Sequence, residues 1–120
     1  MEPCSQGFNW LAFNVRLGDI MSANPLDIYK KFDPKVIESF ENMQKLAFSE
    51  GALPQKVKTL IAMAIDVEHG SAQGATSLGQ RAIKLGATRD EIIETLRVAY
   101  YVGGNRALFT SAMVLQSLFK

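Results

Sequence analysis

The stretch that decides the fold runs from Leu53 to Asn105 and reads LPQKVKTLIAMAIDVEHGSAQGATSLGQRAIKLGATRDEIIETLRVAYYVGGN. Apolar residues recur in it at every third or fourth position, which is the period of an amphipathic helix. The first helix is predicted over residues 54–69, and Gly70 stands where a left-handed C-terminal cap is expected. The stripe of this helix that we expect to face the core consists of Val57, Leu60, Ile61, Ala64 and Ile65.

A second helix is predicted over residues 72–85, ending at Gly86, and it forms a central helical hairpin with the first. Thr88 and Glu91 have the spacing of a capping box, in which the hydroxyl and the carboxylate each accept from the other residue's backbone amide. A third helix therefore begins there. The Gly103-Gly104 pair breaks it and leads into a last helix that continues to residue 119.

The N-terminal part of the chain also contains residues that typically begin and end helices. Asp33-Pro34 reads as an N-cap followed by proline at the first helical position, which starts a helix running toward Gly51. Upstream, apolar residues from Trp10 to Met21 recur at helical spacing, before a break at residues 24–25 and a short segment over residues 26–31. No stretch alternates with period two over more than a few residues. The sequence predicts one all-α domain over residues 1–120 with five to six helices.

The charge balance gives no support for a nucleic-acid partner. Thirteen basic residues against twelve acidic ones leave a net charge of +1, whereas binding to a phosphate backbone depends on clustered lysine and arginine. The N-terminus MEPCSQ has no basic region, and polar and charged residues interrupt the apolar stretch over residues 8–21. We therefore expect neither a signal peptide nor a membrane span, and a cytoplasmic location.

The chain has one cysteine, Cys4, and one histidine, His69. A single cysteine rules out an intrachain disulfide and fits a reducing compartment. His, Asp and Glu do not recur at the spacing of metal ligands, so a metal site is not expected. No Gly-x-Gly-x-x-Gly or phosphate loop appears, and no cofactor is expected. Cys4 is either a bystander near the terminus or a thiol delivered to a neighbouring subunit.

Three pieces of the chain, taken with their spacing, resemble the core of the carboxymuconolactone decarboxylase-like family, which includes the alkylhydroperoxidase D-like proteins. The pieces cover residues 53–64, residues 84–88 with the following Glu91-Ile92, and residues 99–104. The resemblance implies an all-helical domain with the family core at about residues 33–119. It also implies that the protein assembles as a trimer or a hexamer.

The thiol-active members of that family carry a Cys-x-x-Cys after the Gly70 equivalent, a histidine four residues later and a glutamate one helix earlier. In this chain the corresponding positions hold Ser71, Gly74, Leu78 and Thr59. A serine hydroxyl does not form a nucleophilic anion near neutral pH without an adjacent base. Leu78 has no proton to transfer, and Thr59 is not an acid near pH 7. The resemblance therefore implies the scaffold without its thiol peroxidase chemistry.

Polar residues remain close to these positions. Glu68 and His69 end the first hairpin helix, and either Glu68 or Asp66 could orient the imidazole as a general acid or base. Alternatively, His69 simply interacts with the carbonyls at the helix C-terminus.

Ser71 and Gln73 open the second helix, where backbone amides and the helix dipole favour an anion. Arg81, ten residues after Ser71, is a candidate counter-charge for a small carboxylate. As an alternative to a binding role, Ser71 serves only as the N-cap of this helix.

Three functions fit the sequence. The first is an oligomeric protein that binds a small anionic molecule near residues 68–73. The second is a lyase or decarboxylase that acts on a small carboxylic acid, with His69 and Glu68 as acid-base groups and Arg81 as the carboxylate clamp. The third is a non-catalytic oligomeric scaffold whose functional surface is an interface.

Overall fold

A computed structural model describes residues 25–120. This part of the chain contains a short 3-10 turn, η1, and six α-helices, and it contains no strand, which confirms the predicted all-α class. The helix expected over residues 10–21, and Cys4, lie outside the described residues. The elements are η1 (Pro25–Asp27), α2 (Ile28–Phe32), α3 (Pro34–Phe48), α4 (Gln55–Glu68), α5 (Ala72–Lys84), α6 (Arg89–Gly103) and α7 (Asn105–Phe119).

The chain divides into two compact units between Ala47 and Phe48. In the first unit α3 begins at Pro34, as expected of a proline that fits the first helical position. Ile37 is buried, whereas Phe40 and other large apolar residues of α3 are exposed. The single domain expected over residues 1–120 stays a prediction.

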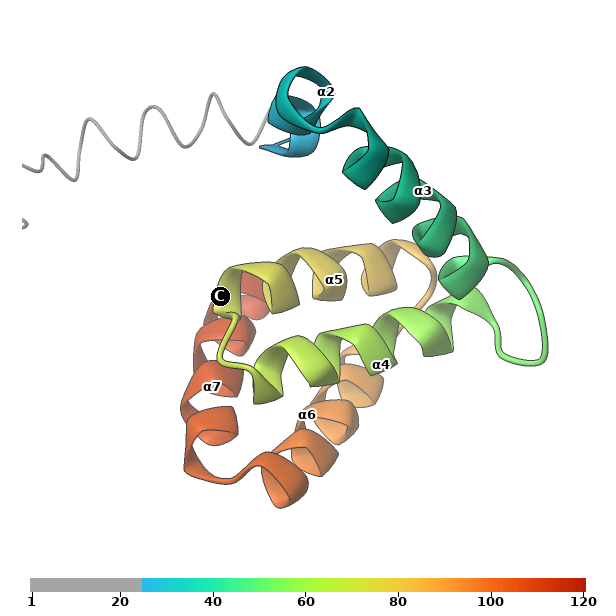
Figure 1. Ribbon diagram of the computed structural model, residues 1–120. Helices are drawn as coiled ribbons and strands as arrows, with labels where there is room; N and C mark the ends of the chain where they lie inside the picture. Colours follow the sequence, from blue (N-terminus) through green and yellow to red (C-terminus); the bar gives the residue numbers. More distant parts are fainter. Residues whose placement is uncertain (1–24) are drawn as a thin grey trace, which may run out of the picture. The chain divides into compact units, whose positions relative to one another are not determined.

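The second unit consists of α4, α5, α6 and α7. The helix α4 packs against the other three, and α7 also packs against α5 and α6. Figure 1 shows α4 and α5 side by side and joined by a short turn, which is the predicted hairpin. The buried core residues are Met63, Val67, Ala75, Ala82, Ala87, Ile92, Leu96, Ala99, Ala107 and Val114.

The face of α4 that enters this core differs from the predicted stripe. Met63 and Val67 are fully buried, together with Thr59 one turn earlier, whereas Ile61 and Ile65 are 45% and 51% exposed. The expectation that Ile61 and Ile65 face the core was therefore wrong. Apolar residues lie on nearly all sides of α4, so the helical period alone does not select which side is buried. Two other residues of the predicted stripe do pack against the core, namely Leu60 and Ala64.

The end of α4 is fixed by a Schellman motif. Gly70 adopts a left-handed conformation with φ +83°. Its amide donates to the carbonyl of Val67 at 3.0 Å, and the amide of Ser71 donates to the carbonyl of Asp66 at 2.8 Å. Gly86 ends α5 with φ +100°. Both predicted glycine caps are confirmed, and the α4–α5 turn has a defined geometry.

The start of α6 is held by the predicted capping box. The Glu91 amide donates to Thr88 Oγ1 at 3.1 Å, and the Thr88 amide donates to Glu91 Oε1 at 2.9 Å. Lys56 Nζ on α4 donates to Glu91 Oε2 at 3.0 Å. The hydrogen bond from the Thr88 amide, followed by the one from Lys56, lowers the pKa of the Glu91 carboxyl. This carboxylate therefore ties the beginning of α6 to the beginning of α4.

Candidate functional site

The acid-base residues predicted at the end of α4 lie next to each other. His69 is the C-cap of α4, and its Nε2 atom is 3.6 Å from Glu68 Oε1. Its amide donates to the carbonyl of Ile65 at 3.0 Å, which continues the helix by one residue. The His69 side chain is 67% exposed. The imidazole is thus open to solvent, beside a carboxylate that can orient it.

Arg106, in the first turn of α7, lies at the same turn. Its Nη2 atom is 3.9 Å from Glu68 Oε2. Its Cδ atom lies 3.2 Å from the point that a Cβ on Gly70 would take. The sequence did not identify Arg106 as a site residue, because it is 38 positions after Glu68 and only the packing of α7 brings it there. A guanidinium group and an imidazole therefore flank one carboxylate at the α4–α5 turn.

The opening of α5 has its own polar cluster. Ser71 occupies the N-cap position, yet its side chain makes no capping hydrogen bond. A Cβ added to Gly74 would lie 2.5 Å from Asp66 Oδ2 and 2.8 Å from Ser71 Oγ. Two oxygen atoms thus lie close to the position that a side chain at residue 74 would take.

The remaining two predicted ligand-binding residues belong to different parts of α5. Gln73 is exposed in the first turn of the helix, near Ser71. Arg81 lies ten residues beyond Ser71, which corresponds to about 15 Å along a helix. Its guanidinium carbon is 5.0 Å from the centroid of the Phe48 ring. The structure therefore gathers Glu68, His69, Ser71 and Gln73 near one turn, and it does not bring Arg81 to them.

Thr59 and Leu78 occupy the positions of the proton-relay residues in the thiol-active proteins, and both pack in the second unit. Thr59 is fully buried, and its hydroxyl donates to the carbonyl of Gln55 at 2.8 Å. Leu78 is half-buried and packs against the core. With Cys4 as its single cysteine, the chain has no Cys-x-x-Cys. The geometry at the α4–α5 turn suits ion pairing and acid-base chemistry.

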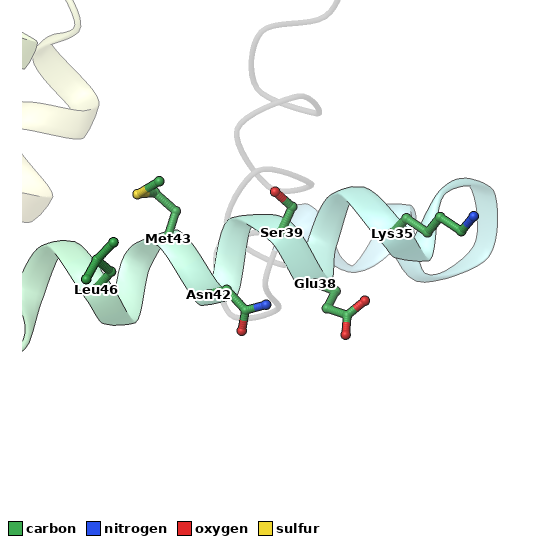
Figure 2. Close-up of a pocket in the computed structure, with 6 residues that line it drawn as sticks. All are labelled: Lys35, Glu38, Ser39, Asn42, Met43 and Leu46. Carbon is green, nitrogen blue, oxygen red and sulfur yellow. The ribbon is translucent and has the colours of Figure 1, made fainter.

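Two surface hollows occur away from the turn. One, of about 530 Å³, is lined by residues of α3 alone, and Figure 2 shows that their side chains project to different sides of the helix. A hollow of about 440 Å³ lies between the ends of α5 and α7 and is lined by Gln80, Ile83, Lys84, Ser117 and Leu118. Neither of these two hollows includes a predicted site residue.

Two features are absent from residues 25–120. No group of three His, Cys, Asp or Glu side chains in this range is arranged to hold a metal ion. None of the helices described there combines the length and apolar character that crossing a membrane requires.

Comparisons with known proteins give several matches. The model of the carboxymuconolactone decarboxylase family matches residues 34–116. The crystal structure of a carboxymuconolactone decarboxylase family protein from Legionella pneumophila is similar with a TM-score of 0.74 and 35% sequence identity, covering 83% of this chain and 88% of that one.

Two curated relatives are uncharacterized proteins. One, from Methanocaldococcus jannaschii, is 26% identical over 97 residues, which is 81% of this chain and 90% of the relative. The other, from Cupriavidus necator, is 32% identical over 71 residues, covering 59% and 63% respectively. The family model covers well over half of the sequence and the solved structure has the same fold, so this chain belongs to the carboxymuconolactone decarboxylase family.

Proposed function

We propose that this protein works without thiol peroxidase chemistry and binds a small anionic molecule at the α4–α5 turn. The observation that carries the proposal is the position of Arg106, whose guanidinium reaches the turn from α7 and is 66% exposed. Arginine presents planar donor pairs that match a carboxylate. Arg106 thus supplies the counter-charge that the sequence analysis expected from Arg81.

The contact between Arg106 and Glu68 leaves the guanidinium available. The Nη2–Oε2 distance is 3.9 Å, and both side chains are substantially exposed. Exposed ion pairs of this kind contribute only about 0–1 kcal/mol, because solvent screens them and ordering two long side chains costs entropy. A ligand carboxylate can therefore replace Glu68 as the partner of Arg106 at little energetic cost, while His69 lies on the other side of Glu68.

Titration of the protein with acetate, malonate and benzoate, followed by amide chemical shifts, tests the proposal. We expect shifts at residues 68–73 and 103–106. Arg106→Gln should weaken binding about tenfold, which corresponds to the loss of one charge-assisted hydrogen bond at an exposed site. Arg81→Gln is the matched control, because this arginine lies against Phe48. Binding that is equally strong in both variants, or no binding by wild type, contradicts the proposal.

A second candidate function is a lyase or decarboxylase reaction on a small carboxylic acid. The 3.6 Å separation between His69 Nε2 and Glu68 Oε1 favours it, because a carboxylate next to an imidazole can orient the ring for acid-base catalysis. Carbon dioxide release from candidate acids should then depend on the imidazole of His69. The release should fall to background in His69→Gln, and undiminished release by this variant would exclude His69 from the reaction.

We also propose that copies of the chain associate, as a trimer or a hexamer. Tyr101, Val102 and Phe109, on either side of the Gly103-Gly104 break, are 88%, 76% and 70% exposed. Large apolar side chains that are exposed within nine residues of one another favour an interaction site. Native mass spectrometry of wild type and of Tyr101→Glu/Phe109→Glu tests this, with the assembly expected in the first and monomers in the second. An assembly that is the same in both proteins, or a monomeric wild type, refutes the assignment of this surface.

The third function expected from the sequence is a non-catalytic scaffold. It is the favoured function if the assembly forms and neither ligand binding nor turnover is found.

A further inference from the structure

Glu68 lies between two basic side chains and makes no direct hydrogen bond to either. Its Oε2 atom is 3.9 Å from Arg106 Nη2, and its Oε1 atom is 3.6 Å from His69 Nε2. Both separations exceed the roughly 2.7–3.2 Å of a hydrogen bond between nitrogen and oxygen. The carboxylate and the guanidinium are therefore both able to accept a closer partner.

The stem of Glu68 packs against the end of α6. A Cβ on Gly103 would lie 3.6 Å from Glu68 Cβ and 3.0 Å from Glu68 Cγ. The half-buried side chain can thus move its carboxylate only by rotation about its outer bonds. The negative charge of Glu68 consequently remains near Arg106 when another molecule approaches the guanidinium.

Helix ends give this turn a negative side and a positive side. The C-terminus of a helix carries a partial negative charge and the N-terminus a partial positive one. The helices α4 and α6 end at Glu68 and Gly103, and neither has a basic residue in its last turn. The helix α7 has no acidic residue in its first turn, which contains Arg106. The Glu68 side therefore favours a cation, and the Arg106 side favours an anion.

A simple monocarboxylate matches only one of these two sides. On Arg106 it would take the place of Glu68 and lie beside that carboxylate, and two like charges repel each other. We infer that the site binds a zwitterion of the α-amino acid class, whose carboxylate pairs with Arg106 and whose ammonium group pairs with Glu68. An α-amino acid carries both charged groups on one carbon, which suits the short distance between these two side chains. The inference names the ligand class of the proposed site and rests on that proposal.

Three ligands that differ in one substituent test the inference. Free L-alanine, L-lactate and propionate share a carbon chain and a carboxylate, and their α-carbons carry an ammonium group, a hydroxyl group and a hydrogen atom, respectively. Affinities at pH 7 are measured from the amide chemical shifts of residues 68–73 and 103–106. Alanine should bind about tenfold more tightly than propionate, as expected for one added charge-assisted contact at an exposed site, and lactate should bind with intermediate affinity. Equal affinities for alanine and propionate overturn the inference and leave the proposed function intact.

Glu68→Gln tests the partner of the ammonium group. This variant keeps the length of the side chain and removes its charge, so alanine should lose most of its advantage, while propionate should bind as tightly as before or more tightly. Weaker binding of both ligands would indicate a general disturbance of the turn and would contradict the inference.

Glu94→Gln is the matched control for net charge. Glu94 is exposed on α6, nine positions before Gly103, which corresponds to about 14 Å along a helix. Its replacement should leave the affinities for alanine and propionate unchanged, and equal effects of the two variants would overturn the role of Glu68. If none of the three ligands binds to wild type, the proposed function fails, and this inference fails with it.

Discussion

Removal of the Thr88 hydroxyl should destabilise the second unit by a predictable amount. In Thr88→Ala the Glu91 amide loses its acceptor at 3.1 Å, while the bonds from the Thr88 amide and from Lys56 to the Glu91 carboxylate remain possible. Replacing an N-cap threonine by alanine costs about 1 kcal/mol. For a domain of this size the change corresponds to a fall in Tm of about 4–8 °C.

Thr95→Ala is the matched control on the same helix. The Thr95 hydroxyl donates to the Glu91 carbonyl at 2.8 Å, which is a bond within the helix that the backbone ladder makes dispensable. Alanine has the higher helix propensity, by roughly half a kcal/mol. Urea unfolding followed by circular dichroism should therefore show a lower midpoint with unchanged slope for Thr88→Ala, and an equal or higher midpoint for Thr95→Ala.

The two variants separate capping from the general loss of a hydroxyl. If Thr88→Ala and Thr95→Ala lower the urea midpoint equally, the capping box does not stabilise the start of α6. If Thr88→Ala has no effect, the bonds to the Glu91 carboxylate suffice on their own.

Three further predictions concern single side chains. Because its partners lower the pKa of Glu91 in the folded state, this carboxylate stabilises the fold above its ordinary pKa of 4.5, and the contribution is lost as the pH falls through the folded-state pKa. The stability difference between wild type and Glu91→Gln should thus shrink in acid, and a constant difference from pH 7 to pH 2 contradicts this. Ser111 Oγ is buried and has no hydrogen-bond partner among the described residues, so Ser111→Ala should stabilise the protein by about 1 kcal/mol. The exposed Ser117→Ala should change stability by less than about 0.5 kcal/mol, and equal effects of the two would show that the Ser111 hydroxyl carries no burial penalty. Hydroperoxide consumption by wild type and by Cys4→Ser should be equal and at background, and efficient turnover by wild type would refute the thiol-independent function.

Features encoded within a few residues could be predicted from the sequence. The capping box joins Thr88 and Glu91, which are three positions apart, and the left-handed caps at Gly70 and Gly86 follow directly from helix-end geometry. His69 and Glu68 lie together because they are adjacent at a helix end. None of these features depends on how the helices pack, so one helix turn of sequence was enough.

Features that depend on tertiary packing were predicted less well. Arg81 was chosen as the counter-charge because it shares a helix with Ser71, but ten residues of helix separate them, and Arg106 arrives from α7. No periodicity connects Arg106 with Glu68. The closeness of Asp66 to Gly74 likewise depends on the α4–α5 turn, which folds residue 66 back toward the first turn of α5.

The incorrect expectation for α4 has a physical consequence. Its sequence supplies two apolar faces: one, with Met63 and Val67, fills the core, while Ile61 and Ile65 remain about half exposed. Full burial of an isoleucine is worth about 1.5–3 kcal/mol, so a second apolar face left in water forgoes stabilisation that contact with another chain can provide. A helix that is apolar on nearly all sides is typical of one covered on more than one side. The exposed isoleucines of α4 thus support the proposed self-association independently of Tyr101 and Phe109. On this proposal, the stripe predicted from the helical period includes residues that become buried between chains and not within one chain.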